Sequence, residues 1–124
     1  MEKIYSIGHS TKTWEDFTEQ LEWIQFDYLV DVRSRPYSRF VPHFNRNQII
    51  DKLWDKYIFM WDTLGWMDEE ISHEKFMYWV DKLAALAKGN IVAFFCSEKS
   101  EFKCHRLHKV TPELEIRWFK VIHL

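Results

Sequence analysis

The chain has 124 residues, a length that suits one domain with a core of its own. Apolar residues make up 47% of the sequence, with only 3 glycines and 3 prolines, which excludes a disordered or low-complexity chain. The net charge of −2 argues against a protein that coats nucleic acid with a broad basic face. We therefore predict a single globular domain over residues 1–124, and the alternation of strands and helices described below makes it an α/β domain.

No apolar run approaches the roughly 20 residues that a membrane-spanning helix needs. The first residues also lack the pattern of a signal peptide. These features predict a cytoplasmic protein without membrane contact. The 2 cysteines are too few for a disulfide scaffold. No cofactor is expected.

In the first half of the chain, strands and helices are predicted to alternate. A strand over residues 4–7 precedes a helix that Thr13 can cap, in which apolar residues recur at helical spacing. A second strand covers 28–32 and leads into a long arm, 33–45, that contains two prolines. A short helix over 49–54 and a third strand over 57–61 follow.

In the second half, Ser72 can cap a helix with apolar positions from Phe76 to Leu86, and Gly89 is placed to end it. The fourth strand, 91–95, is apolar at every position, as expected for a central parallel strand. Residues 103–110 suit a short helix that Pro112 interrupts, and 117–123 suit a final strand. The order predicts three layers: a mostly parallel sheet of about five strands, with helices on both faces.

Three of the predicted strands end abruptly in polar clusters. The clusters are Gly8-His9-Ser10, Asp31-Val32-Arg33-Ser34 and Cys96-Ser97-Glu98. If the strands are parallel, the clusters share one edge of the sheet, where open α/β sheets bind their ligands. The sequence therefore predicts a polar pocket at the carboxyl ends of the strands, shared by His9, Asp31, Arg33, Glu98 and Cys104.

Four motifs occur in order along the chain: Ile4–Ser10, Asp31–Arg39 with Pro42–Asn45, Leu64-Gly65, and Cys96-Ser97-Glu98 with Cys104-His105-Arg106. With these motifs the chain resembles the Domain of Unknown Function 488 family from its first strand to its last. The family usually has a second glycine where this chain has Trp66, and alanine where it has Ser97. The resemblance implies a compact α/β fold with the motifs around one site, and it supplies no reaction.

Positive charge is concentrated in the arm. Residues 32–50 contain four arginines (Arg33, Arg35, Arg39 and Arg46) and no acid, so the rest of the chain carries 13 basic against 19 acidic residues. A local cationic segment indicates an anionic ligand, and the interleaved aromatic residues suit a nucleotide or a short nucleic acid. The candidate ligand-binding residues are Gly8, His9, Ser10, Arg33, Ser34, Arg39, Cys96, His105 and Arg106. The alternative is a solvated loop, or arginines paired with Asp31 and Glu98.

Cys104 is a candidate nucleophile, because a helix start and Arg106 would lower the pKa of its thiol. The alternative is a packed cysteine. A thiolate phosphatase is disfavoured, since the residue six after Cys96 is Phe102 rather than arginine. A metal site at these cysteines, His9 and His105 is also disfavoured, because the spacing lacks close ligand pairs. A Cys96–Cys104 disulfide stays open.

Asp31 and Glu98 are the candidate acid and base, since two carboxylates at buried strand ends can have well-separated pKa values. The alternative is a structural salt bridge to Arg33 or Arg106. The backbone N–H groups of His9 and Ser10 are expected to point at an anion.

Three hypotheses for function follow. The first is a hydrolase or transferase acting on a phosphorylated or nucleotide-like substrate. The second is a non-catalytic nucleic-acid-binding module that uses the arm from Arg33 to Arg46. The third is an interaction or assembly protein, including association of further copies of this chain, because Trp61, Trp66 and Trp118 do not all fit a small core.

Overall fold

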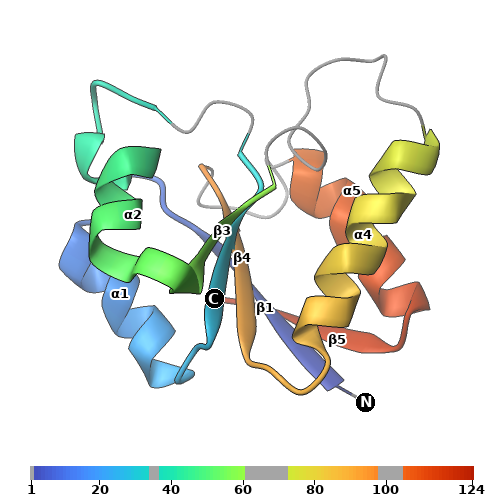
Figure 1. Ribbon diagram of the computed structural model, residues 1–124. Helices are drawn as coiled ribbons and strands as arrows, with labels where there is room; N and C mark the ends of the chain where they lie inside the picture. The colour runs from blue at the N-terminus through green and yellow to red at the C-terminus, as the bar shows by residue number, and fades with distance from the viewer. Residues whose placement is uncertain (1, 34–36, 61–72, 98–104) are drawn as a thin grey trace.

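The computed structural model describes residues 2–33, 37–60, 73–97 and 105–124. It contains one sheet of five strands, all parallel (Figure 1). In chain order the strands are β1 (Glu2–Gly8), β2 (Tyr28–Asp31), β3 (Tyr57–Phe59), β4 (Val92–Cys96) and β5 (Phe119–His123). Their order across the sheet is β3-β2-β4-β1-β5. The predicted parallel sheet of about five strands is confirmed.

Helices cover both faces of this sheet (Figure 1). One face carries α1 (Trp14–Trp23) and α2 (Arg46–Leu53), and the other carries α4 (His73–Ala87) and α5 (His105–Ile116). Short 3₁₀ turns, η1 (Pro42–Phe44) and η2 (Trp54–Lys56), flank α2. The three-layer α/β domain is therefore as predicted.

Strand β4 divides the apolar interior into two clusters. Val92, Phe94 and Cys96 pack on the side of α4 and α5, and Ala93 and Phe95 pack on the side of α1 and α2. All five residues are buried, because β4 is central and side chains alternate between the two faces. This confirms the prediction of a strand buried on both faces.

Helix α1 begins as its sequence indicates. Thr13 Oγ1 accepts a hydrogen bond from the backbone N–H of Asp16 at 3.1 Å, which satisfies one of the N–H groups at the helix start. Phe17 and Leu21 on the apolar face of α1 are fully buried.

Thr13→Ala should lower the free energy of unfolding by about 1 kcal/mol, because the cap is lost. Urea unfolding of the variant beside Thr11→Ala, a nearby exposed threonine that caps no helix, measures this effect. Equal stability of the two variants would contradict the capping role of Thr13.

The prediction that Pro112 interrupts the last helix is wrong. Helix α5 runs through Pro112 to Ile116. Proline removes one backbone hydrogen bond from a helix interior, at a cost of about 3 kcal/mol. Val110 and Leu114 are fully buried on either side of Pro112, and their packing against the sheet holds both halves of the helix in line.

Other element boundaries differ slightly from the prediction. Helix α2 ends at Leu53, and β5 begins at Phe119 rather than at residue 117. Both limits coincide with tryptophans in the left-handed region, Trp54 (φ 51°) and Trp118 (φ 69°). Each is 77% exposed, and the exposure of Trp118 agrees with the expectation that Trp61, Trp66 and Trp118 do not all fit the core. Trp61, Trp66 and the Ser72 cap lie outside the described residues.

Across the described ranges, no helix has both the length and the apolar character needed to cross a membrane.

Candidate functional site

Strands β1, β2 and β4 end at the same edge of the sheet. Gly8 is the register partner of Cys96, and Asp31 is the partner of Phe95. This confirms that the three strands are parallel and that their polar ends lie together at one edge.

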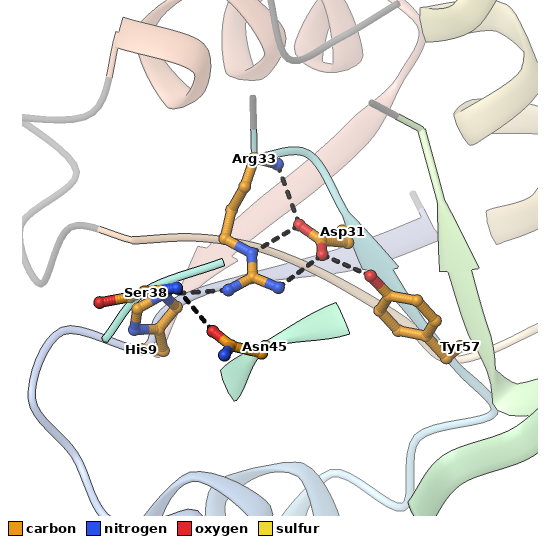
Figure 2. Close-up of polar contacts among 6 residues, drawn as sticks. All are labelled: His9, Asp31, Arg33, Ser38, Asn45 and Tyr57. Carbon is orange, nitrogen blue, oxygen red and sulfur yellow. Dashed lines mark hydrogen bonds and ion pairs between the residues drawn. The ribbon is translucent and has the colours of Figure 1, made fainter. Parts of the chain in front are cut away.

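A buried ion pair dominates this edge. The Arg33 side chain donates from Nε to Asp31 Oδ1 at 2.9 Å and from Nη2 to Asp31 Oδ2 at 2.7 Å, and its backbone N–H donates to Oδ1 at 3.0 Å (Figure 2). Arg33 is 3% exposed and Asp31 is 0% exposed. The guanidinium also lies 4.7 Å from the ring centre of Phe95. The bidentate geometry fixes the plane of the guanidinium group.

Tyr57, at the start of β3, completes the surroundings of Asp31. Its hydroxyl donates to Asp31 Oδ2 at 2.5 Å. Burial, followed by the negative charge of Asp31, raises the pKa of Tyr57 above its ordinary value, so the phenol keeps its proton and remains a donor. Asp31 thus accepts hydrogen bonds from three groups of Arg33 and one of Tyr57. These contacts favour the alternative reading of Asp31, a structural salt bridge to Arg33, over a role as a general acid or base.

His9 is held as a neutral imidazole. Its Nδ1 lies 2.9 Å from the carbonyl oxygen of Ser10, to which it donates, so that Nε2 is left to accept from Arg33 Nη1 at 3.3 Å. Burial, and to a smaller extent the charge of Arg33, lowers the pKa of His9 to about 4. The ring stacks on Phe44 with a centroid distance of 4.5 Å.

The backbone N–H groups after β1 are engaged within the fold. His9 donates to the carbonyl of Cys96 at 3.0 Å, and Ser10 donates to that of Ser97 at 2.9 Å. The expectation that these two groups point at an anion is therefore wrong. The parallel pairing of β1 with β4 continues past the ends of these strands, and the N–H groups of His9 and Ser10 are used in it.

The start of α2 lies at the same edge, because Phe44, which stacks on His9, directly precedes Asn45. Asn45 occupies the N-cap position, yet no side-chain cap bond forms within the described chain. Its Oδ1 accepts instead from the backbone N–H of Ser38 at 2.6 Å (Figure 2). The helix N-terminus therefore keeps its partial positive charge without a side-chain cap.

A second arginine packs over the strand next to Asp31. The guanidinium carbon of Arg46 lies 4.4 Å from the ring centre of Phe59, which is the register partner of Asp31. Among the described residues, Arg46 forms no ion pair, and its buried Nε has no hydrogen-bond partner. Because Phe59 and Asp31 are cross-strand neighbours, Arg46 packs over the sheet residue next to Asp31.

Several predicted site residues lie outside the described ranges. Ser34, Glu98 and Cys104 are among them, as are the side chains of His105 and Arg106. The hypotheses that place Glu98 and Cys104 in this site, and a disulfide or metal at Cys104, therefore stay predictions. Arg39 is exposed and Cys96 is buried. Among the described residues, no three His, Cys, Asp or Glu side chains are grouped as a metal site would need.

Sequence reasoning missed Tyr57 and Asn45 as members of the site. It placed Arg46 in the cationic arm without assigning it to the strand ends. Tyr57 had one usable signal, since it begins the strand predicted after the arm and is a polar aromatic residue in an apolar run. Its hydrogen bond to Asp31 depends on the β2–β3 register, which the sequence does not specify.

No family model matches the chain, and no curated protein matches it. The resemblance to the Domain of Unknown Function 488 family therefore stays a prediction.

Proposed function

We propose that the carboxyl edge of the sheet binds the phosphate group of a small ligand, on which the protein acts by hydrolysis or transfer. The observation that supports this proposal is the excess of positive over negative side chains at this edge. Arg33 is paired with the carboxylate of Asp31, and Arg46 packs over Phe59, the register partner of Asp31, without an ion pair among the described residues. His9 adds no charge of its own near neutral pH, because its pKa is about 4. Among the described residues, Arg33, Arg46 and Asp31 thus together carry one net positive charge.

Arg33 has donors to spare for a ligand. A guanidinium group carries five N–H donors. Asp31 accepts from two of them and His9 from one, and the Tyr57 hydroxyl interacts with the same group, so at most two Nη hydrogens are open to a ligand. Because the same contacts hold the group rigid, a ligand that uses these donors loses little side-chain entropy.

The uncapped start of α2 supports the same conclusion. The first N–H groups of a helix point outward and favour an anion through the helix dipole. Asn45 leaves them uncapped by a side chain, and Arg46 adds a full positive charge at the first helical position.

The reaction itself depends on residues predicted from the sequence. Asp31 is saturated with hydrogen bonds, and the Nε2 lone pair of His9 is directed at Arg33. Proton transfer is therefore assigned to Glu98 and nucleophilic attack to Cys104, as part of the proposal.

A nucleic-acid-binding arm receives less support. Of the arm's arginines that the structure describes, Arg33 is buried in an ion pair, Arg46 lies over Phe59, and Arg39 is exposed. A groove that follows a nucleic-acid backbone needs a series of exposed cations. The described residues favour one anionic group instead.

Replacing Arg46 with Gln should weaken the binding of inorganic phosphate about tenfold, since a charge-assisted hydrogen bond contributes about 1.5 kcal/mol or more. Calorimetric titration at low salt measures the affinity. Lys120→Gln is the control, because it removes the same charge from an exposed position on the edge strand β5. Equal affinities for the two variants, or no phosphate binding by the unaltered protein, would contradict the proposal.

A further inference from the structure

We propose that the ligand is a mononucleotide whose base stacks on the turn formed by residues 37–40. This inference rests on the proposed phosphate site and specifies its substrate class. Two aromatic side chains of this turn are displayed to solvent: Tyr37 is 61% exposed and Phe40 is 87% exposed. Neither belongs to the apolar clusters that hold the helices on the sheet.

The turn is built as a defined platform. Ser38 Oγ accepts hydrogen bonds from the backbone N–H groups of Phe40 at 3.1 Å and Val41 at 3.3 Å. Such a side-chain-to-backbone pattern fixes the path of a turn. Val41 in turn packs against the apolar cluster beneath α1 and α2. The exposed aromatic rings therefore stand on an anchored segment.

The same serine ties the turn to the phosphate site. The backbone N–H of Ser38 donates to Asn45 Oδ1 at 2.6 Å, and Asn45 directly precedes Arg46 (Figure 2). Tyr37 is adjacent to Ser38, and Phe40 is two residues further along the chain. A ligand whose phosphate occupies the site thus has aromatic surface within its reach.

The chemistry of the turn suits a nucleobase. Exposed Arg39 lies between the two aromatic residues. Aromatic rings stack on any base because every base has a π-face, and arginine adds cation–π attraction. Sugar phosphates and inorganic phosphate have no flat ring that could stack on these side chains.

A single nucleotide fits better than a strand. In the arm, Arg39 is the exposed arginine among those that the structure describes, whereas Arg33 and Arg46 are held at the sheet edge. One exposed cation can contact one small ligand, whereas a nucleic-acid strand needs a series of exposed cations along its phosphates.

The test compares adenosine 5′-monophosphate (AMP), ribose 5-phosphate and inorganic phosphate by calorimetric titration of the full chain. Base stacking is expected to make AMP bind about five- to 150-fold more tightly than ribose 5-phosphate. Phe40→Ala and Tyr37→Ala should each remove much of that advantage and leave the affinity for ribose 5-phosphate unchanged. Trp23→Ala is the control, because Trp23 is 86% exposed at the far end of α1.

The outcomes separate the two proposals. If ribose 5-phosphate and AMP bind equally well, the base is not recognised and this inference fails, while the phosphate site stands. If none of the three ligands binds, the phosphate site fails as well. A single-stranded oligonucleotide that binds far more tightly than AMP, with a steep salt dependence, would overturn the mononucleotide in favour of nucleic acid.

Discussion

Replacing Arg33 with Met should lower the free energy of unfolding by about 3–5 kcal/mol, because the variant leaves the Asp31 carboxylate buried without its counter-charge. Asp31 is 0% exposed, so water cannot take the place of the guanidinium group. Methionine keeps an apolar stem of similar length against Phe95, and loss of packing is therefore a minor part of the effect.

Two further variants make this result specific. Asp31→Asn/Arg33→Met removes both charges and keeps an acceptor for the Tyr57 hydroxyl, so it should recover at least half of the lost stability. Arg117→Met removes ion pairs with Asp81, which is 67% exposed, and with Glu113, together with a hydrogen bond to the Glu113 carbonyl, and should cost only about 1–2 kcal/mol. Urea unfolding measures all three proteins. A double variant no more stable than Arg33→Met would show that the buried charge is not the cause.

Stability should also fall in mild acid because of His9. Its pKa is about 4 in the folded protein and 6.5 ordinarily, so the unfolded chain binds a proton more readily than the folded one. The stabilisation is complete above pH 6.5 and is lost as the pH falls from there to about 4. A difference of about 2.5 between the two pKa values corresponds to about 3 kcal/mol.

His9→Gln isolates this contribution. Glutamine offers an oxygen that can accept from Arg33 and does not titrate. Urea unfolding between about pH 7 and pH 4.5 should show a shallower loss of stability for His9→Gln than for the unaltered protein, since all other groups titrate in both. Parallel stability curves would mean that His9 is not held neutral by the fold.

Much of the fold was predictable because each strand and helix carries a local signal. The run 91–95 is apolar at every position and became the doubly buried β4, and Thr13 marks the start of α1 as its residue type indicates. The prediction at Pro112 was wrong because it considered only the backbone hydrogen bond that proline removes. The burial of Val110 and Leu114, which keeps the helix continuous, depends on tertiary packing.

The site was predictable only in part. The position of Asp31 and Arg33 at a strand end followed from the apolar run before them, and the parallel topology brought His9 to the same edge. Two hydrogen bonds at the site were not predictable, one because it depends on strand register and one because it depends on the path of the segment before α2. Tyr57 reaches Asp31 through the pairing of β2 with β3, and the Asn45 side chain bonds Ser38 instead of capping α2.

The most direct test of the phosphate site is a titration of ¹⁵N-labelled protein with inorganic phosphate, followed by two-dimensional ¹H–¹⁵N NMR spectra. We expect the largest shifts at the Arg33 Nε–H signal and at the backbone N–H groups of Arg46 and Asn47, which begin α2. Signals of the edge strand β5, including Lys120, should stay in place. Shifts spread over surface lysines, with Arg33 and the start of α2 unmoved, would contradict an anion site at the carboxyl edge of the sheet.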